Sequence, residues 1–125
     1  MDFSFSGLKT AVMYHWKECE RTEREKNRIC YSFQETVADV ISGKAAMALD
    51  ATGFDVLSVG GGVVQNTAIR KALSDVCGPG GTRLYLPEKG YCGDNGAMTA
   101  LLGEKLYRGG KRSDLDIKIC PSGSY

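Results

Sequence analysis

Histidine is nearly absent from this chain, which has His15 as the only one among its 125 residues. The zinc proteases that carry an HExxH motif need two histidines on one helix. A serine or cysteine hydrolase needs a histidine base, held by a third group, beside its nucleophile. No such constellation can be assembled here, so the sequence excludes peptidase chemistry of these types.

The chain also lacks a strong net charge and any long apolar run. Its 16 basic and 15 acidic residues leave a formal charge of +1, which gives no field strong enough to hold nucleic acid or an anionic membrane unaided. No segment approaches the length of a membrane span, and the first ten residues do not resemble a signal peptide. We therefore expect a cytoplasmic protein without membrane contact, in which any RNA binding relies on local basic patches or on other chains.

Paired cysteine motifs are missing as well. The five cysteines contain no CxxC pair and are odd in number, which argues against a disulfide framework and favours reduced, mostly packing thiols. His15 and Cys19 stand four residues apart on an expected helix and offer two potential metal ligands. Two ligands alone do not make a metal site.

What is present is an ordinary globular composition, 42% hydrophobic and 25% charged, sufficient for one core. Alternating Phe3 and Phe5 suggest a short strand before a helix that carries Leu8, Val12 and Trp16 on one stripe. The charged stretch 17–28 is expected to be the solvated end of that helix.

The second expected helix begins with a capping box, Ser32 and Glu35, and ends at Gly53. The rest of the pattern alternates strands and helices: a strand over 55–59, a helix through Ile69 and Leu73, a strand over 83–86, and a helix from about 94 to 107. This order predicts an α/β fold with a parallel sheet. Only three strands are visible, and the open edges of so small a sheet indicate an incomplete fold.

The richest segment is FDVLSVGGGVVQN, residues 54–66. Gly60, Gly61 and Gly62 lack Cβ atoms, so backbone N–H groups can approach a ligand closely, and a helix starting just after them would direct its positive dipole end to the same point. The pattern predicts an anion-binding corner. It is neither a P-loop nor a GxGxxG turn, and a tight turn without a ligand is equally compatible with it.

A second motif, YCGDNGAMTA at residues 91–100, places Asp94 before the last expected helix. Loops that leave the carboxyl ends of parallel strands open on one side of a sheet, so we expect Asp94 and the glycine corner to face the same crevice. Asp94 is either an ordinary N-cap or a metal ligand. Spacing alone leaves both open.

Four segments in register, DFSFSGLKTAV, SFQETVADV, GGGVVQN and CGDNGAM, closely resemble the C-terminal lobe of the TsaD/OSGEP (Gcp, Kae-type) family. The resemblance implies transfer of a threonylcarbamoyl group from threonylcarbamoyl-AMP to N6 of adenosine 37 in tRNAs that read ANN codons. It also implies the two-lobed, actin-like (ASKHA, ribonuclease H-like) ATPase architecture with a divalent metal, iron or zinc, between the lobes. Its implied partners are tRNA, threonylcarbamoyl-AMP or ATP, and TsaB/TsaE-like or KEOPS-like proteins.

By this resemblance Asp94 is the carboxylate metal ligand, Asn66 holds the nucleotide part of the substrate, and Gly61 and Gly62 form the phosphate-side backbone. Residues 1–110 would be the partial lobe and residues 111–125 an irregular tail. The family's HxxxH motif is absent, and His15 lies in the wrong segment to replace it. The expected function is therefore a partial transferase that is inactive without the missing N-terminal lobe; the alternative is a non-catalytic lobe that binds nucleotide or partner proteins.

Overall fold

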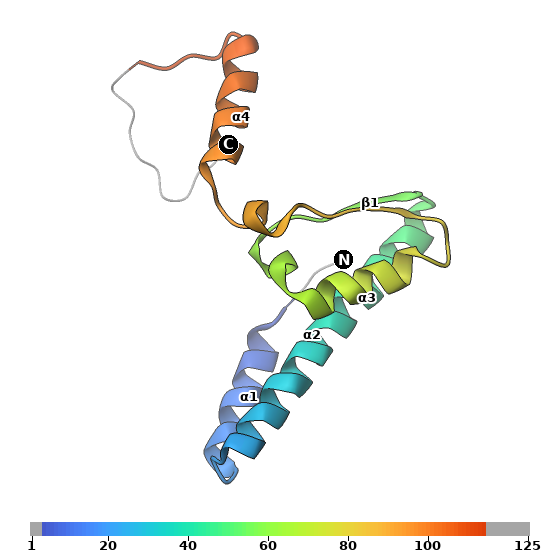
Figure 1. Ribbon diagram of the computed structural model, residues 1–125, viewed down its shortest axis with the longest axis vertical. Coiled ribbons are helices and arrows are strands. Elements are labelled where there is room, and N and C mark those ends of the chain that lie inside the picture. The colour runs from blue at the N-terminus through green and yellow to red at the C-terminus, as the bar shows by residue number, and fades with distance from the viewer. Residues whose placement is uncertain (1–3, 115–125) are drawn as a thin grey trace. The chain divides into compact units, whose positions relative to one another are not determined.

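The computed structural model describes residues 4–114, and the chain divides into two compact units, with the boundary in the sequence between Gly93 and Asp94. None of the described helices combines the length and apolar character needed to cross a membrane. The first unit contains α1 (Ser6–Glu18), α2 (Glu23–Thr52), β1 (Val56–Ser58), the 3-10 helix η1 (Gly62–Gln65), α3 (Thr67–Cys77), β2 (Arg83–Tyr85) and the 3-10 helix η2 (Lys89–Tyr91). The second unit contains α4 (Gly96–Arg108) (Figure 1).

The two N-terminal helices form a hairpin in which α1 runs beside the first half of α2 (Figure 1). The stripe predicted for α1, Leu8, Val12 and Trp16, is its half-buried side. The expected start of α2 was wrong: Thr22, not Ser32, is the N-cap, and its Oγ1 accepts a hydrogen bond from the backbone N–H of Glu25 at 3.2 Å.

The reason for this error lies in the charged stretch 17–28, which was expected to be the solvated end of the first helix but extends beyond the end of α1 at Glu18. It contains the turn between the helices and the first turns of α2, where Lys26 pairs with Glu23 and Arg28 pairs with Glu25, each at 3.1 Å. These i,i+3 pairs suit a helix interior. Both Thr22 and Ser32 precede a glutamate by three residues, so the capping pattern was ambiguous in the sequence.

The core of the first unit lies where α2 and α3 pack together and against the strands. Ala38 on α2 and Ile69 and Leu73 on α3 are buried, and Leu73 is only 1% exposed. Gly53 ends α2 in the left-handed conformation, with φ of +67°, as its position in the sequence predicted. Half-buried residues complete this core: Val37, Ile41, Ala45, Leu57, Val59, Ala72, Leu84 and Leu86.

The sheet of the described residues has two parallel strands, β1 and β2, with Leu57 opposite Leu84. The chain passes from one strand to the other through α3, which confirms the α/β class. The third expected strand is not formed within this part of the chain: Ser4 and Phe5 are in neither strand nor helix, and Phe3 lies outside the described residues.

The second unit consists of α4 and the residues around it. Gly109 caps the helix, its N–H donating to the carbonyl of Lys105 at 3.0 Å. Residues 111–114 of the expected irregular tail form neither helix nor strand, and residues 115–125 lie outside the described residues. Large apolar side chains of α4 are exposed: Met98, Leu101, Leu102, Leu106 and Tyr107.

Candidate functional site

The glycine corner follows β1 directly, as the sequence predicted. Gly61 has φ of +95° and ψ of 162°, a backbone conformation that residues other than glycine rarely adopt. A Cβ atom built on Gly60, Gly61 or Gly62 would meet no other atom within 4 Å. The corner therefore presents open backbone, and glycine is required at Gly61 by its dihedral angles rather than by crowding.

The helix that was expected to begin directly after the glycine corner begins further along the chain. The corner leads into η1, and α3 begins only at Thr67. The Oδ1 atom of Asn66 accepts hydrogen bonds from the N–H groups of Ala68 at 2.8 Å and Ile69 at 3.4 Å. Asn66 therefore caps α3: the N–H groups of Ala68 and Ile69, which have no partner within the helix, donate to its side chain and are not available to a ligand at Gly61.

The other end of the Asn66 amide joins α3 to α2. Its Nδ2 atom donates a hydrogen bond to Oε1 of Gln34, with the atoms 3.1 Å apart. A groove of about 620 Å³ lies beside this pair, and its lining includes Gln65 and Asn66 together with apolar residues such as Phe33. Small-molecule sites typically measure about 300–1,000 Å³, so the groove can accommodate a ligand of that size.

Arg70 organises this site, and the sequence analysis did not identify it. Its Nε atom donates to the carbonyl of Val64 in η1 at 2.7 Å, and its Nη2 atom donates to the carbonyl of Pro87 and lies 3.2 Å from the sulfur of Cys92. The guanidinium group thus ties the turn after the glycine corner to the loop after β2. An arginine four residues after the N-cap Asn66 was the available signal, but such a position is usually solvated.

Asp94 belongs to the second unit, where its side chain is exposed. The N-cap of α4 is Asn95, whose Oδ1 accepts from the N–H of Met98 at 3.0 Å, so the N-cap alternative for Asp94 was wrong. Within residues 4–114 the Asp94 carboxylate has neither a hydrogen bond nor an ion pair. A carboxylate with both oxygens available fits one ligand position of a hard or borderline divalent metal.

Comparison with known proteins identifies a family that covers the segments described above. The family model for TsaD, described as tRNA N6-adenosine threonylcarbamoyltransferase, matches residues 1–101. Curated relatives of that name include one from Francisella philomiragia, 41% identical over 95% of this chain, and one from Francisella tularensis subsp. novicida, 40% identical over 95% of it. In both cases the chain spans about 36% of the length of the relative. The glycine corner, Asn66 and Asp94 all lie within the matched residues, and the chain belongs to the TsaD family of tRNA N6-adenosine threonylcarbamoyltransferases.

Proposed function

We propose that this chain contributes residues to a threonylcarbamoyl transfer site, in a protein of actin-like architecture that acts in the cytoplasm. The match to the TsaD family over residues 1–101 is the observation that carries this proposal. The donor is threonylcarbamoyl-AMP, and the acceptor is N6 of adenosine 37 in tRNAs that read ANN codons. The rest of the site, including two histidine ligands, comes from the part of the family protein that this chain does not cover.

On the substrate side, Gly61 and Gly62 receive the phosphate of the adenylate through their backbone, which lies open. Asn66 holds the nucleotide part. One N–H of its amide already donates to Gln34, and an amide carries two. The second N–H remains for a ribose or base oxygen, while the cap and the Gln34 contact keep the side chain in place.

On the metal side, Asp94 supplies one oxygen ligand to an iron or zinc ion. Its exposed, unpaired carboxylate supports this role. When bound, such an ion would supply Lewis-acid polarisation of the carbamoyl carbonyl. A single carboxylate does not hold such an ion, so we expect the chain alone to have no transferase activity. TsaB/TsaE-like or KEOPS-like proteins are the expected partners of the complete enzyme.

In the test, the chain is mixed with, or fused to, the part of the family protein that it does not cover. Transfer of labelled threonine to tRNA is measured with a source of threonylcarbamoyl-AMP. We expect transfer only in the complemented protein, loss of metal and transfer in Asp94→Ala, and weaker adenylate binding with normal metal content in Asn66→Ala. Retention of both metal and activity by Asp94→Ala would overturn the metal assignment. Adenylate binding without transfer in the complemented protein would favour a non-catalytic lobe.

A further inference from the structure

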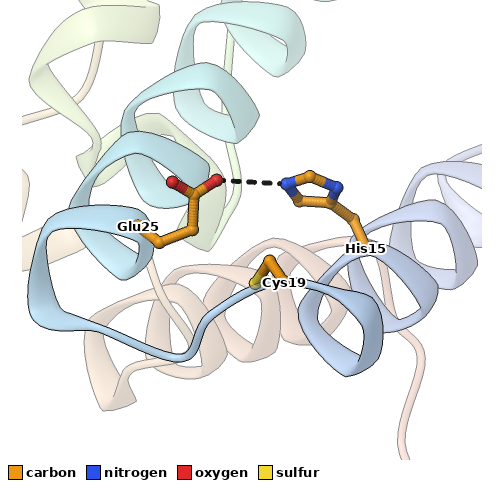
Figure 2. Close-up of side chains that lie close together, drawn as sticks. All are labelled: His15, Cys19 and Glu25. Carbon is orange, nitrogen blue, oxygen red and sulfur yellow. Dashed lines mark hydrogen bonds and ion pairs between the residues drawn. The ribbon is translucent and has the colours of Figure 1, made fainter.

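Three potential metal ligands converge beside the turn that joins α1 to α2. His15 lies in the last turn of α1, Cys19 caps that helix, and Glu25 lies in the first turn of α2. The imidazole nitrogen, the thiol sulfur and a carboxylate oxygen all lie within 4.8 Å of one another. Figure 2 shows the imidazole and the carboxylate facing each other across the gap between the helices, with Cys19 at the turn between them. No residue of this cluster belongs to the transfer site described above.

The spacing of these atoms is close to that of a metal centre. His15 Nε2 and Glu25 Oε1 are 3.2 Å apart. In a tetrahedral zinc site, bonds of about 2.0–2.3 Å place neighbouring ligand atoms about 3.3–3.8 Å apart. The nitrogen and the oxygen are therefore already at near-ligand separation. The sulfur lies within 4.8 Å of both, so it needs a shift of at most about 1.5 Å to reach ligand separation, within reach of a Cys19 side-chain rotation.

The surroundings favour an ordered site that a cation can enter. Arg28 Nη1 lies 3.1 Å from Glu25 Oε2, which holds the carboxylate and leaves Oε1 directed at His15. Arg21 lies in the turn itself, and its Nε atom donates to the carbonyl of Trp16. The His15 side chain is 58% exposed and that of Glu25 is 20% exposed, so the cluster is accessible from solvent without being fully solvated.

We propose that His15, Cys19 and Glu25 form a binding site for a zinc-class divalent cation that closes the α1–α2 hairpin. Nitrogen, thiolate and carboxylate ligands together suit zinc, with water in the fourth position. Binding releases the thiol proton of Cys19 to the buffer, and the neutral imidazole keeps its proton on Nδ1 while Nε2 coordinates. The site does not depend on the proposed transferase function, because it uses neither Asp94 nor any residue that the chain lacks.

The test uses cobalt(II) as a spectroscopic probe for zinc. We expect the 125-residue chain to bind one equivalent of cobalt with a thiolate-to-cobalt charge-transfer band, and zinc to displace it. Cys19→Ser should abolish that band. His15→Gln and Glu25→Gln should each weaken zinc binding by more than about tenfold. Loss of a residue that only hydrogen-bonds a metal ligand already costs about tenfold in affinity, and loss of a ligand itself should cost more.

Matched controls separate this site from adventitious binding. Cys30→Ser removes an exposed thiol on α2, and Glu23→Gln neutralises another glutamate in the first turn of α2; both should bind cobalt as the unaltered chain does. Asp94→Ala should also be unaffected, which separates this site from the expected family metal. Circular dichroism verifies helix content in each protein. A helical chain without the cobalt band, or a band that survives Cys19→Ser or disappears in Cys30→Ser, would overturn the proposal.

Discussion

Asn66 and Gln34 join α3 to α2 through a side-chain hydrogen bond of 3.1 Å, directly beside the glycine corner. The same Asn66 side chain caps α3 through its Oδ1 atom. A residue assigned by family resemblance to substrate binding is therefore also a structural residue. Its loss affects both stability and binding, and the two effects have to be measured separately.

Replacement of Asn66 separates these two effects. Asn66→Ala removes the cap, worth about 0.5–2 kcal/mol, and the bond to Gln34, worth about 0.5–1.5 kcal/mol, so we expect the free energy of unfolding to fall by about 1–3 kcal/mol. Asn66→Ser keeps a capping oxygen and loses only the bond to Gln34, so it should be less destabilising. Urea denaturation measures both, with Gln34→Ala as the control that removes the bond from the other side. Equal losses in Asn66→Ala and Asn66→Ser would show that the cap contributes little.

The glycine corner allows a comparison between neighbouring positions. Gly61→Ala forces a Cβ atom into a glycine-type conformation, and we expect destabilisation of about 1–3 kcal/mol. Gly62→Ala meets no atom within 4 Å and has no positive φ, so its stability should be close to that of the unaltered chain. Thermal unfolding followed by circular dichroism distinguishes the two. If both variants melt alike, the conformation of Gly61 does not constrain the corner.

Arg70 should be among the polar residues most important for stability. Arg70→Met removes the guanidinium donor from the carbonyls of Val64 and Pro87 and leaves Pro87 with only the weak thiol donor of Cys92. Hydrogen bonds from charged groups contribute about 1.5–3 kcal/mol, and we expect a loss of this size in urea denaturation. Lys71→Met, next to it on α3, removes only an exposed pair with Asp75 and should have no measurable effect. A stable Arg70→Met chain would mean that water replaces the guanidinium group.

The cysteines should differ in reactivity. Burial raises the pKa of the Cys77 thiol, and this side chain is 2% exposed, whereas Cys30 is exposed. Cys77 should therefore react with iodoacetamide much more slowly than Cys30 at pH 8, as measured by peptide mass spectrometry over time. Because the folded state favours the neutral thiol, its contribution to stability is fully present below the usual thiol pKa and is lost as the pH rises through the raised pKa of the folded state. Equal labelling rates in the folded chain would contradict this burial.

The apolar side chains of α4 should make the isolated chain self-associate. Met98, Leu102 and Leu106 recur every four residues, and each is at least 40% exposed. Leu102→Glu combined with Leu106→Glu should shift the chain toward the monomer in size-exclusion chromatography. Ala100→Glu adds a charge on the opposite side of the helix and serves as the control. A monomeric unaltered chain at high concentration would contradict this prediction.

Much of the fold follows from local patterns in the sequence. The strands around Leu57 and Leu84, the end of α2 at Gly53 and the approximate span of α4 were predicted, because alternation, helical spacing and glycine conformation act over a few residues. The start of α2 was not, since Thr22 and Ser32 offer the same capping pattern and only the packing of the hairpin selects one of them.

The functional residues divide in the same way. The sequence by itself identified the family and the glycine corner, because the positions of the glycines and the order of the motifs are properties of the sequence. Only the tertiary structure brought Gln34 to Asn66, Arg70 to the carbonyl of Pro87, and Glu25 to the pair formed by His15 and Cys19. These partners lie on separate elements, and the packing of those elements, not their spacing in sequence, sets which side chains meet.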